Sequence, residues 1–225
     1  MPFSTFPDPS TLMELDKKTF SLLQCDPIFG RESVLQGHAC TAFSSISSNK
    51  GYSFDSSFDA NIEDRKNRRV YVASRVICNK HIYKEISHCF AICECGVTPK
   101  LLRKVHFDIT FSDPSSGDLH PVYHFQLDGS LTKKMENDGY DDSELTSAIS
   151  VPRWPYQPIS AALFFDVVFR ELGNQDLRDF IATPGWKKRV AENEKKILVP
   201  YYEFAVQHIN SASKTPFVDK LYGIT

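Results

Sequence analysis

The feature that most constrains the fold is a pair of alternating segments, residues 103–111 and 119–127, separated by the stretch SDPSSGD. Most odd-numbered positions in both segments carry apolar residues such as Phe107 and Phe125, whereas most even-numbered positions carry polar ones. A period of two is typical of β-strands, and Pro, Gly, Ser and Asp favour tight turns. The pattern therefore predicts an antiparallel hairpin with one apolar face and one polar face.

Further strands are expected upstream of this hairpin. The segments RVYVASRVIC and HIYKEISHCFAICEC are rich in β-branched and aromatic residues, which favour strands. Downstream, ISAALFFDVVFRELG is apolar on nearly all sides and ends at Gly173, so it predicts a buried helix over 158–172 against the apolar face. The expected fold class is α+β: an antiparallel sheet of about four strands packed by this helix, with helical N- and C-terminal segments.

The chain is expected to form a single domain, since 225 residues with 41% hydrophobic residues can bury one core. The predicted parts are a helical N-terminal part (1–47), a polar loop (48–67), a β region (68–157) and a helical C-terminal part (158–225). The first part contains a helix over 9–24 and a second helical piece near 31–46.

In the C-terminal part, Thr183 and Pro184 predict the start of a helix that Pro200 ends or kinks. The tail keeps four large apolar residues, which need a surface to dock on, and a second subunit is a reasonable one. These residues are Phe217, Val218, Leu221 and Tyr222.

Composition restricts the compartment and the ligands. A formal net charge of −2 predicts no broad nucleic-acid-binding field. No apolar run approaches the roughly 20 residues of a membrane span, and no secretion signal opens the chain, so we expect a cytoplasmic protein. The six cysteines are then thiols, and Cys89, Cys93 and Cys95 fit small buried side chains better than a zinc site. Neither a metal nor a cofactor is expected.

The polar face of the hairpin holds the candidate functional residues. It carries His106, Asp108, His120, His124, Gln126 and Asp128. A symmetric loop would place His106 opposite His124, and His120 opposite Thr110. Two interpretations remain open: a solvated sheet face, or a site in which imidazoles act as general acid and base or as metal ligands.

The proline-rich segment PRWPYQP follows the β region, and its prolines predict an extended path. One interpretation is a rigid connector whose Trp154 packs on the core. The other makes Arg153 an anion clamp beside two stacking rings, Trp154 and Tyr156, as a nucleotide or single-stranded nucleic acid requires.

The order YHFQLDG, an acidic stretch and PRWPYQP resembles proteins associated with bacterial toxin–antitoxin and phage-defence loci. Among these, small toxins of the TumE type have a YHxQ…DG strand. The positions that match are Tyr123, His124, Gln126, Asp128 and Gly129. The resemblance implies a prokaryotic, defence-related setting.

Two functions from different classes follow. In the first, the protein is a metal-independent nuclease or nucleotide-acting effector. Its catalytic residues would be His124, His106, His120, Asp108 and Arg153, and its substrate-binding residues Gln126, Asp128, Trp154 and Tyr156. In the second, it is a non-catalytic interaction subunit of a larger assembly. Expected partners are another protein or a second copy of the chain, with RNA or a nucleotide as a ligand of the effector.

Overall fold

The computed structural model describes residues 9–25, 51–60, 68–79, 82–95, 100–110, 122–127, 139, 154–211, 215–217 and 221. Its helices are α1 (Pro9–Cys25), α5 (Ala161–Leu172), α6 (Gln175–Ala182), α7 (Pro184–Asn193), the π-helix η3 (Glu194–Leu198) and α8 (Val199–Asn210). Its strands are β1 (Gly51–Asp59), β2 (Arg68–Asn79), β3 (Ile82–Glu94), β4 (Lys100–Thr110), β5 (Tyr123–Leu127) and β6 (Trp154–Pro155). The helix predicted over 9–24 is confirmed as α1, whereas the piece predicted near 31–46 lies outside the described residues.

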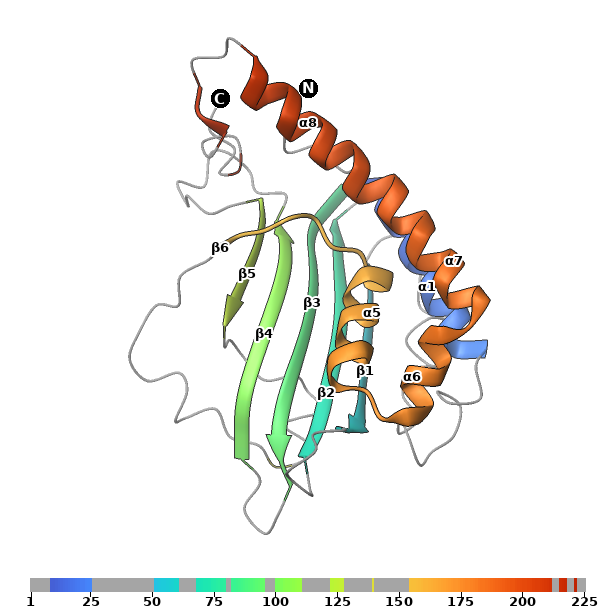
Figure 1. The fold of residues 1–225 in the computed structure, drawn as a ribbon. Coiled ribbons are helices and arrows are strands. Elements are labelled where there is room, and N and C mark those ends of the chain that lie inside the picture. The colour runs from blue at the N-terminus through green and yellow to red at the C-terminus, as the bar shows by residue number, and fades with distance from the viewer. Residues whose placement is uncertain are drawn as a thin grey trace.

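The strands form one antiparallel sheet in sequential order (Figure 1). The α+β class is confirmed, but the sheet has six strands rather than about four. The expectation of a loop over 48–67 is wrong for β1, whose residues pair with β2 from Gly51 opposite Ile77 to Asp59 opposite Arg69. Aspartate and serine lower the strand propensity of this stretch. The pairing with β2 forms through backbone groups, so it does not depend on these side chains.

One face of the sheet is covered by helices, with α5 in front of the first strands and α1 and α7 beside it (Figure 1). The predicted buried helix is confirmed, although it begins at Ala161 rather than at 158. Phe164 of α5 packs against His88, Phe90 and Phe107 of the sheet, with ring centroids 5.4 to 6.5 Å apart. None of the described helices is long and apolar enough to span a bilayer.

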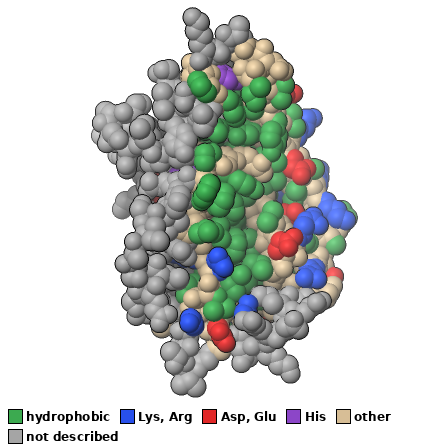
Figure 2. All heavy atoms as spheres, turned by 60° about the vertical axis from the view of Figure 1, so that its left-hand side comes forward, with side chains coloured by type: hydrophobic (Ala, Val, Ile, Leu, Met, Phe, Trp, Pro, Cys, Tyr) green, Lys and Arg blue, Asp and Glu red, His purple; other side chains and the backbone are tan. Residues whose placement is uncertain are grey.

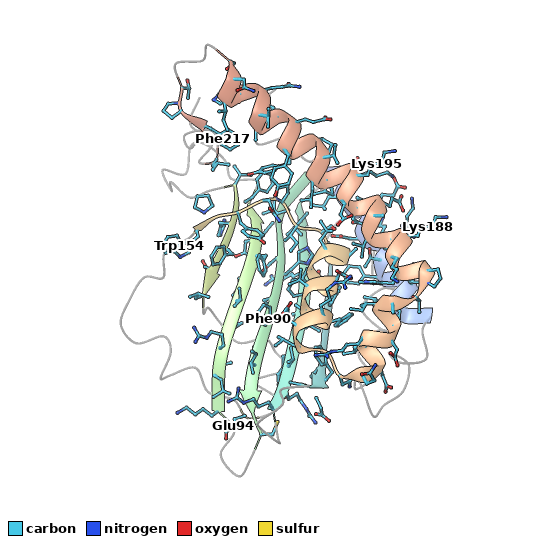
Figure 3. All side chains as sticks on the ribbon, in the orientation of Figure 1. Phe90, Glu94, Trp154, Lys188, Lys195 and Phe217 are labelled. Carbon is cyan, nitrogen blue, oxygen red and sulfur yellow. The ribbon has the colours of Figure 1, made fainter. Side chains whose placement is uncertain are left out.

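The same sheet face stays partly open over β4, β5 and β6. We call this area the sheet band and define it by half-buried Phe107, Phe125 and Tyr156 with exposed Leu127 and Trp154. Figure 2 shows hydrophobic side chains gathered into a continuous strip along the molecule on this side. In Figure 3, Phe90 lies over the sheet beside α5, and Trp154 lies at the outer edge.

The last helices form a continuous run from α7 through η3 to α8 (Figure 1). Thr183 caps α7, its hydroxyl accepting the Trp186 N–H, and Pro184 fills the first turn as predicted. Pro200 does not end the run. The Val199 N–H donates to the Glu194 carbonyl, a π-type bond, and such a wide turn accommodates a proline that lacks an N–H. The short helix α6 was not predicted as a separate helix.

The tail docks on its own chain. Phe217 and Leu221 pack against the main core, and the Val122 N–H donates to the Leu221 carbonyl at 2.9 Å. A second subunit is therefore not the recipient of these two side chains. The other predicted docking residues, Val218 and Tyr222, lie outside the described residues.

A buried polar cluster joins α1, α5 and α7. The Asp16 carboxylate accepts the Ala161 N–H at 2.8 Å, although the two residues are 145 positions apart. The Ser160 hydroxyl donates to Asn193 Oδ1 at 2.7 Å, and the Asn193 amide donates to the Arg189 carbonyl at 2.8 Å. Asp16, Ser160 and Asn193 have no exposed surface, so this cluster fixes the start of α5 between its two neighbours.

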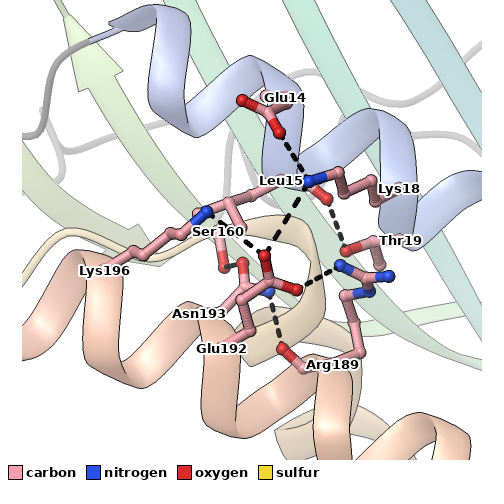
Figure 4. A network of polar contacts seen from close by, with 9 residues as sticks. All are labelled: Glu14, Leu15, Lys18, Thr19, Ser160, Arg189, Glu192, Asn193 and Lys196. Atoms are coloured by element: carbon pink, nitrogen blue, oxygen red, sulfur yellow. Dashed lines mark hydrogen bonds and ion pairs between the residues drawn. The ribbon is translucent and has the colours of Figure 1, made fainter.

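At the rim of this cluster, Figure 4 shows Glu192 between three cationic side chains. Its carboxylate oxygens lie 2.6 Å from Arg189, 3.2 Å from Lys196 and 3.8 Å from Lys18. Exposed ion pairs contribute little each, so the buried hydrogen bonds carry most of the stabilisation.

Replacing Asp16 by Ala should lower the free energy of unfolding by about 1.5–3 kcal/mol, because a buried N–H loses a charged acceptor. Asp16→Asn should lose less, since an amide oxygen can still accept. Urea denaturation measures both, with Glu14→Ala on the exposed side of α1 as the control that leaves the midpoint unchanged. Equal midpoints for Asp16→Ala and the wild type would contradict this role.

Candidate functional site

The polar side of the hairpin is called the histidine face and consists of Cys89, Lys104, His106, Asp108, His124 and Gln126. Cross-strand neighbours in a sheet share a face. Asp108 stands opposite His124, and His106 stands between Cys89 on one side and Gln126 on the other. The parity predicted for these strands is therefore confirmed.

The register differs from the prediction by two residues. His106 was expected opposite His124, yet the partner of His124 is Asp108. Such a shift moves pairs along the strands without exchanging the faces, because the side-chain period is two. The turn residues alone therefore did not define the register of the two strands.

The interpretation of this face as solvated is wrong for the residues that the structure describes. Lys104 is 1% exposed and His124 is 3% exposed. Asp108 retains 16% of its side-chain surface. Next to these residues, a second apolar cluster on the same face contains Tyr71, Ala91, Cys93 and Leu101. The central strands therefore have buried side chains on both faces.

Burial controls the protonation of the histidine face. It lowers the pKa of His106 to about 3, and the nearby Lys104 and His124 act in the same direction. The His106 Nε2 atom is buried and has no hydrogen-bond partner among the described residues. His124 Nε2 lies 3.7 Å from Asp108 Oδ2, within ion-pair range but beyond a hydrogen bond.

This arrangement limits the chemistry available at neutral pH. A general base works best with a pKa near the working pH, and His106 is far below it. His106 is therefore a poor proton acceptor there. The Asp108–His124 pair has the composition of an acid–base pair, in which a carboxylate orients an imidazole.

The other predicted site residues do not join the histidine face where the structure describes them. Trp154 pairs with Phe125, and Tyr156 contacts Phe107 and Phe125 at 5.4 and 5.7 Å, so both rings lie on the helix side of the sheet. Trp154 is 52% exposed, so the expectation that it packs on the core is wrong, and Tyr156 is half-buried. Three further predicted residues, His120, Asp128 and Arg153, lie outside the described residues.

Sequence reasoning missed two members of the histidine face. Lys104 has the same parity as His106, so the alternation alone could have included it. Cys89 becomes visible only through the β3–β4 register. His88, its neighbour in sequence, faces the helices instead, where its Nδ1 lies 2.8 Å from the Ser74 hydroxyl and its ring stacks on Phe164.

The described cysteines have the environment expected of small apolar side chains. Cys89 and Cys93 are buried, Cys95 is half-buried, and all are free thiols. Within the described ranges, no group of three or more His, Cys, Asp or Glu side chains is arranged to hold a metal ion.

A hollow of about 380 Å³ lies among α5, α6 and α7, lined by Arg170, Arg178, Ile181, Ala182 and Lys187. Its cations are largely engaged within the chain. Arg170 pairs with Asp166 at 2.8 Å, and Arg178 donates to the Gly173 carbonyl. Asp166 therefore offsets one of the three positive charges around the hollow.

The two buried histidines predict an acid-sensitive fold. Burial lowers the pKa of His88 and of His106 from 6.5 to about 3. Between these values the unfolded chain binds protons that the folded one does not, so stability falls as the pH falls, by up to about 1.4 kcal/mol per pH unit for each histidine.

Urea denaturation at about pH 7 and about pH 5 measures this loss. His88→Gln and His106→Gln should each reduce the slope of the unfolding free energy against pH by the contribution of one proton, since glutamine does not titrate. An unchanged dependence in either variant would show that the replaced histidine is protonated alike in both states.

The sequence matches no protein family model and no curated protein, and the structure matches no solved structure. The resemblance to toxins of the TumE type therefore stays a prediction.

Proposed function

We propose that this protein is a non-catalytic interaction component that binds an amphipathic helix of a partner protein on the sheet band. The observation that carries the proposal is the exposure of large apolar side chains there: Trp154 is 52% exposed and Leu127 36%. Contiguous apolar patches of this kind commonly mark interaction sites, because burying them is favourable.

The dimensions of the band fit one helix. Neighbouring strands lie about 4.8 Å apart, so β4 to β6 span roughly 10 Å, close to the separation of packed helices. A helix laid beside α5 would rest on Phe107 and Phe125. It would also meet Val167 of α5, which is 53% exposed and lies one turn beyond Phe164 on the same side of that helix.

The burial of the histidine face supports a non-catalytic role. That face lies on the other side of the sheet from the band and is mostly buried. The resemblance of YHFQLDG and PRWPYQP to defence-associated proteins suggests a further expectation, namely that the partner is another component of a prokaryotic toxin or phage-defence system.

Site-specific photo-crosslinking tests the proposal. With p-benzoylphenylalanine in place of Trp154, cells that naturally produce the protein should yield one discrete adduct, and the crosslinked peptide should have helical apolar periodicity. The same probe at Lys188, which is exposed on the opposite side of the molecule, is the control (Figure 3). The absence of an adduct, or the same adduct from both positions, would contradict the proposal.

The crosslinked peptide should then bind the purified protein directly. Trp154→Ala should weaken this binding by roughly 30-fold, since buried aromatic anchors typically contribute about 2 kcal/mol or more. Ile209→Ala is the matched control, because Ile209 is 65% exposed but lies on α8 outside the band. Fluorescence anisotropy measures both affinities.

One observation favours a second candidate, a metal-independent nuclease or nucleotide-acting effector. His124 Nε2 lies 3.7 Å from Asp108 Oδ2, and a carboxylate beside an imidazole can orient it for proton transfer. In this role His124 would transfer a proton and Asp108 would orient it.

Cleavage of labelled single-stranded RNA in the presence of a metal chelator tests this candidate. His124→Ala should lower the rate by about 10²–10⁴-fold, the usual contribution of proton transfer. Arg103→Ala, at an exposed position of β4 that is not a predicted site residue, is the control for a general disturbance of the hairpin, and thermal midpoints identify unfolded variants. A wild type that leaves RNA and nucleotides intact would remove the candidate.

A further inference from the structure

A second apolar surface lies on α8 and adjoins the sheet band at Tyr202, whose hydroxyl donates to Gln157 next to Tyr156. Its members are Val199, Tyr202, Val206 and Ile209, exposed by 48%, 49%, 56% and 65%. We call it the α8 stripe. Residues at these spacings fall within about a quarter of the circumference of a helix, so they form one continuous row. The interior side of α8 is different and is formed by Tyr201 and Ala205, which are buried.

We propose that the α8 stripe binds a second copy of this chain, with the two α8 helices antiparallel about a two-fold axis near Phe204. The stripe is symmetric in sequence. Val199 lies as far before Phe204 as Ile209 lies after it, and Tyr202 and Val206 are likewise equidistant. In an antiparallel pair, Val199 of one copy would meet Ile209 of the other, and Tyr202 would meet Val206.

This self-complementarity favours a second copy over an unrelated partner. A two-fold interface requires one patch that fits itself, and here each apolar side chain meets an apolar side chain in both halves. The stripe carries no charge, and Glu203 is the one acidic residue in α8. No buried ion pair therefore has to be desolvated on pairing.

The length of the helix limits the strength of the pairing. Twelve residues of α-helix extend about 18 Å, and stable interfaces usually bury about 800 Å² on each partner. Four side chains on a helix of this length cover less. The dimer is therefore concentration-dependent, and the inference does not rely on the partner helix proposed for the sheet band.

A charge exchange at the ends of the stripe tests both the dimer and its direction. Val199→Lys and Ile209→Glu each place a charge against an apolar side chain twice per dimer, and each should raise the dissociation constant by at least about tenfold. The double variant Val199→Lys/Ile209→Glu should recover dimerisation, because each lysine then meets a glutamate of the other copy. Ala191→Glu on α7 is the matched control, since it adds a charge at an exposed position outside both the stripe and the sheet band.

Sedimentation equilibrium across a dilution series measures the dimer, and circular dichroism melts confirm that each variant is folded. A wild type that stays monomeric overturns the inference. Single variants that dimerise like the wild type place any dimer elsewhere, which also overturns it. A double variant as monomeric as the single ones excludes the antiparallel register, since parallel helices would set lysine against lysine.

Discussion

The hydrogen bond from the Ala161 N–H to Asp16 sets the geometry on which the rest of the helical layer depends. The first N–H groups of a helix need acceptors from outside it, and a carboxylate there also interacts favourably with the helix dipole. Ser160 occupies the capping position of α5, but its hydroxyl donates to Asn193 instead. The acceptor therefore comes from α1, and this exchange ties the first helix to the central one.

With its start fixed in this way, α5 can cover only part of the sheet. Its aromatic side chains reach Phe58 of β1, His88 and Phe90 of β3, and Phe107 of β4. The outer strands β5 and β6 lie beyond that reach, and their aromatic side chains shield one another from solvent only partly. The open sheet band thus follows from where α5 begins and from the number of strands it faces.

Parity and periodicity predicted the parts of the fold that depend on local patterns. Phe107 and Phe125 share a face because strand side chains alternate, and Thr183–Pro184 starts a helix because a hydroxyl cap and a proline suit its first turn. The register, strand β1 and the Asp16 contact depend on residues far apart in the chain. No local pattern contains them, since each is decided by which segments meet.

The candidate site shows the same division. The sequence placed His106, Asp108 and His124 together on one face, but it could not show that Lys104 and His124 would be nearly free of solvent contact. Exposure depends on what lies above a face, whereas alternation defines only the face itself. The aromatic residues of PRWPYQP were likewise grouped with the histidines by proximity in sequence, and the strand pairing of Trp154 separates them.

The π-turn in η3 has a consequence for how this surface can vary. A π-turn contains one more residue than an α-turn, and each residue of an α-helix rotates the direction of side chains by about 100°. The turn therefore covers nearly the same rotation with one residue more, so loss of a single residue between Glu194 and Leu198 would let it close as an α-turn with Tyr202 still beside Gln157, to which its hydroxyl now donates. Chain length can thus change by one residue at this turn without redirecting the apolar row of α8.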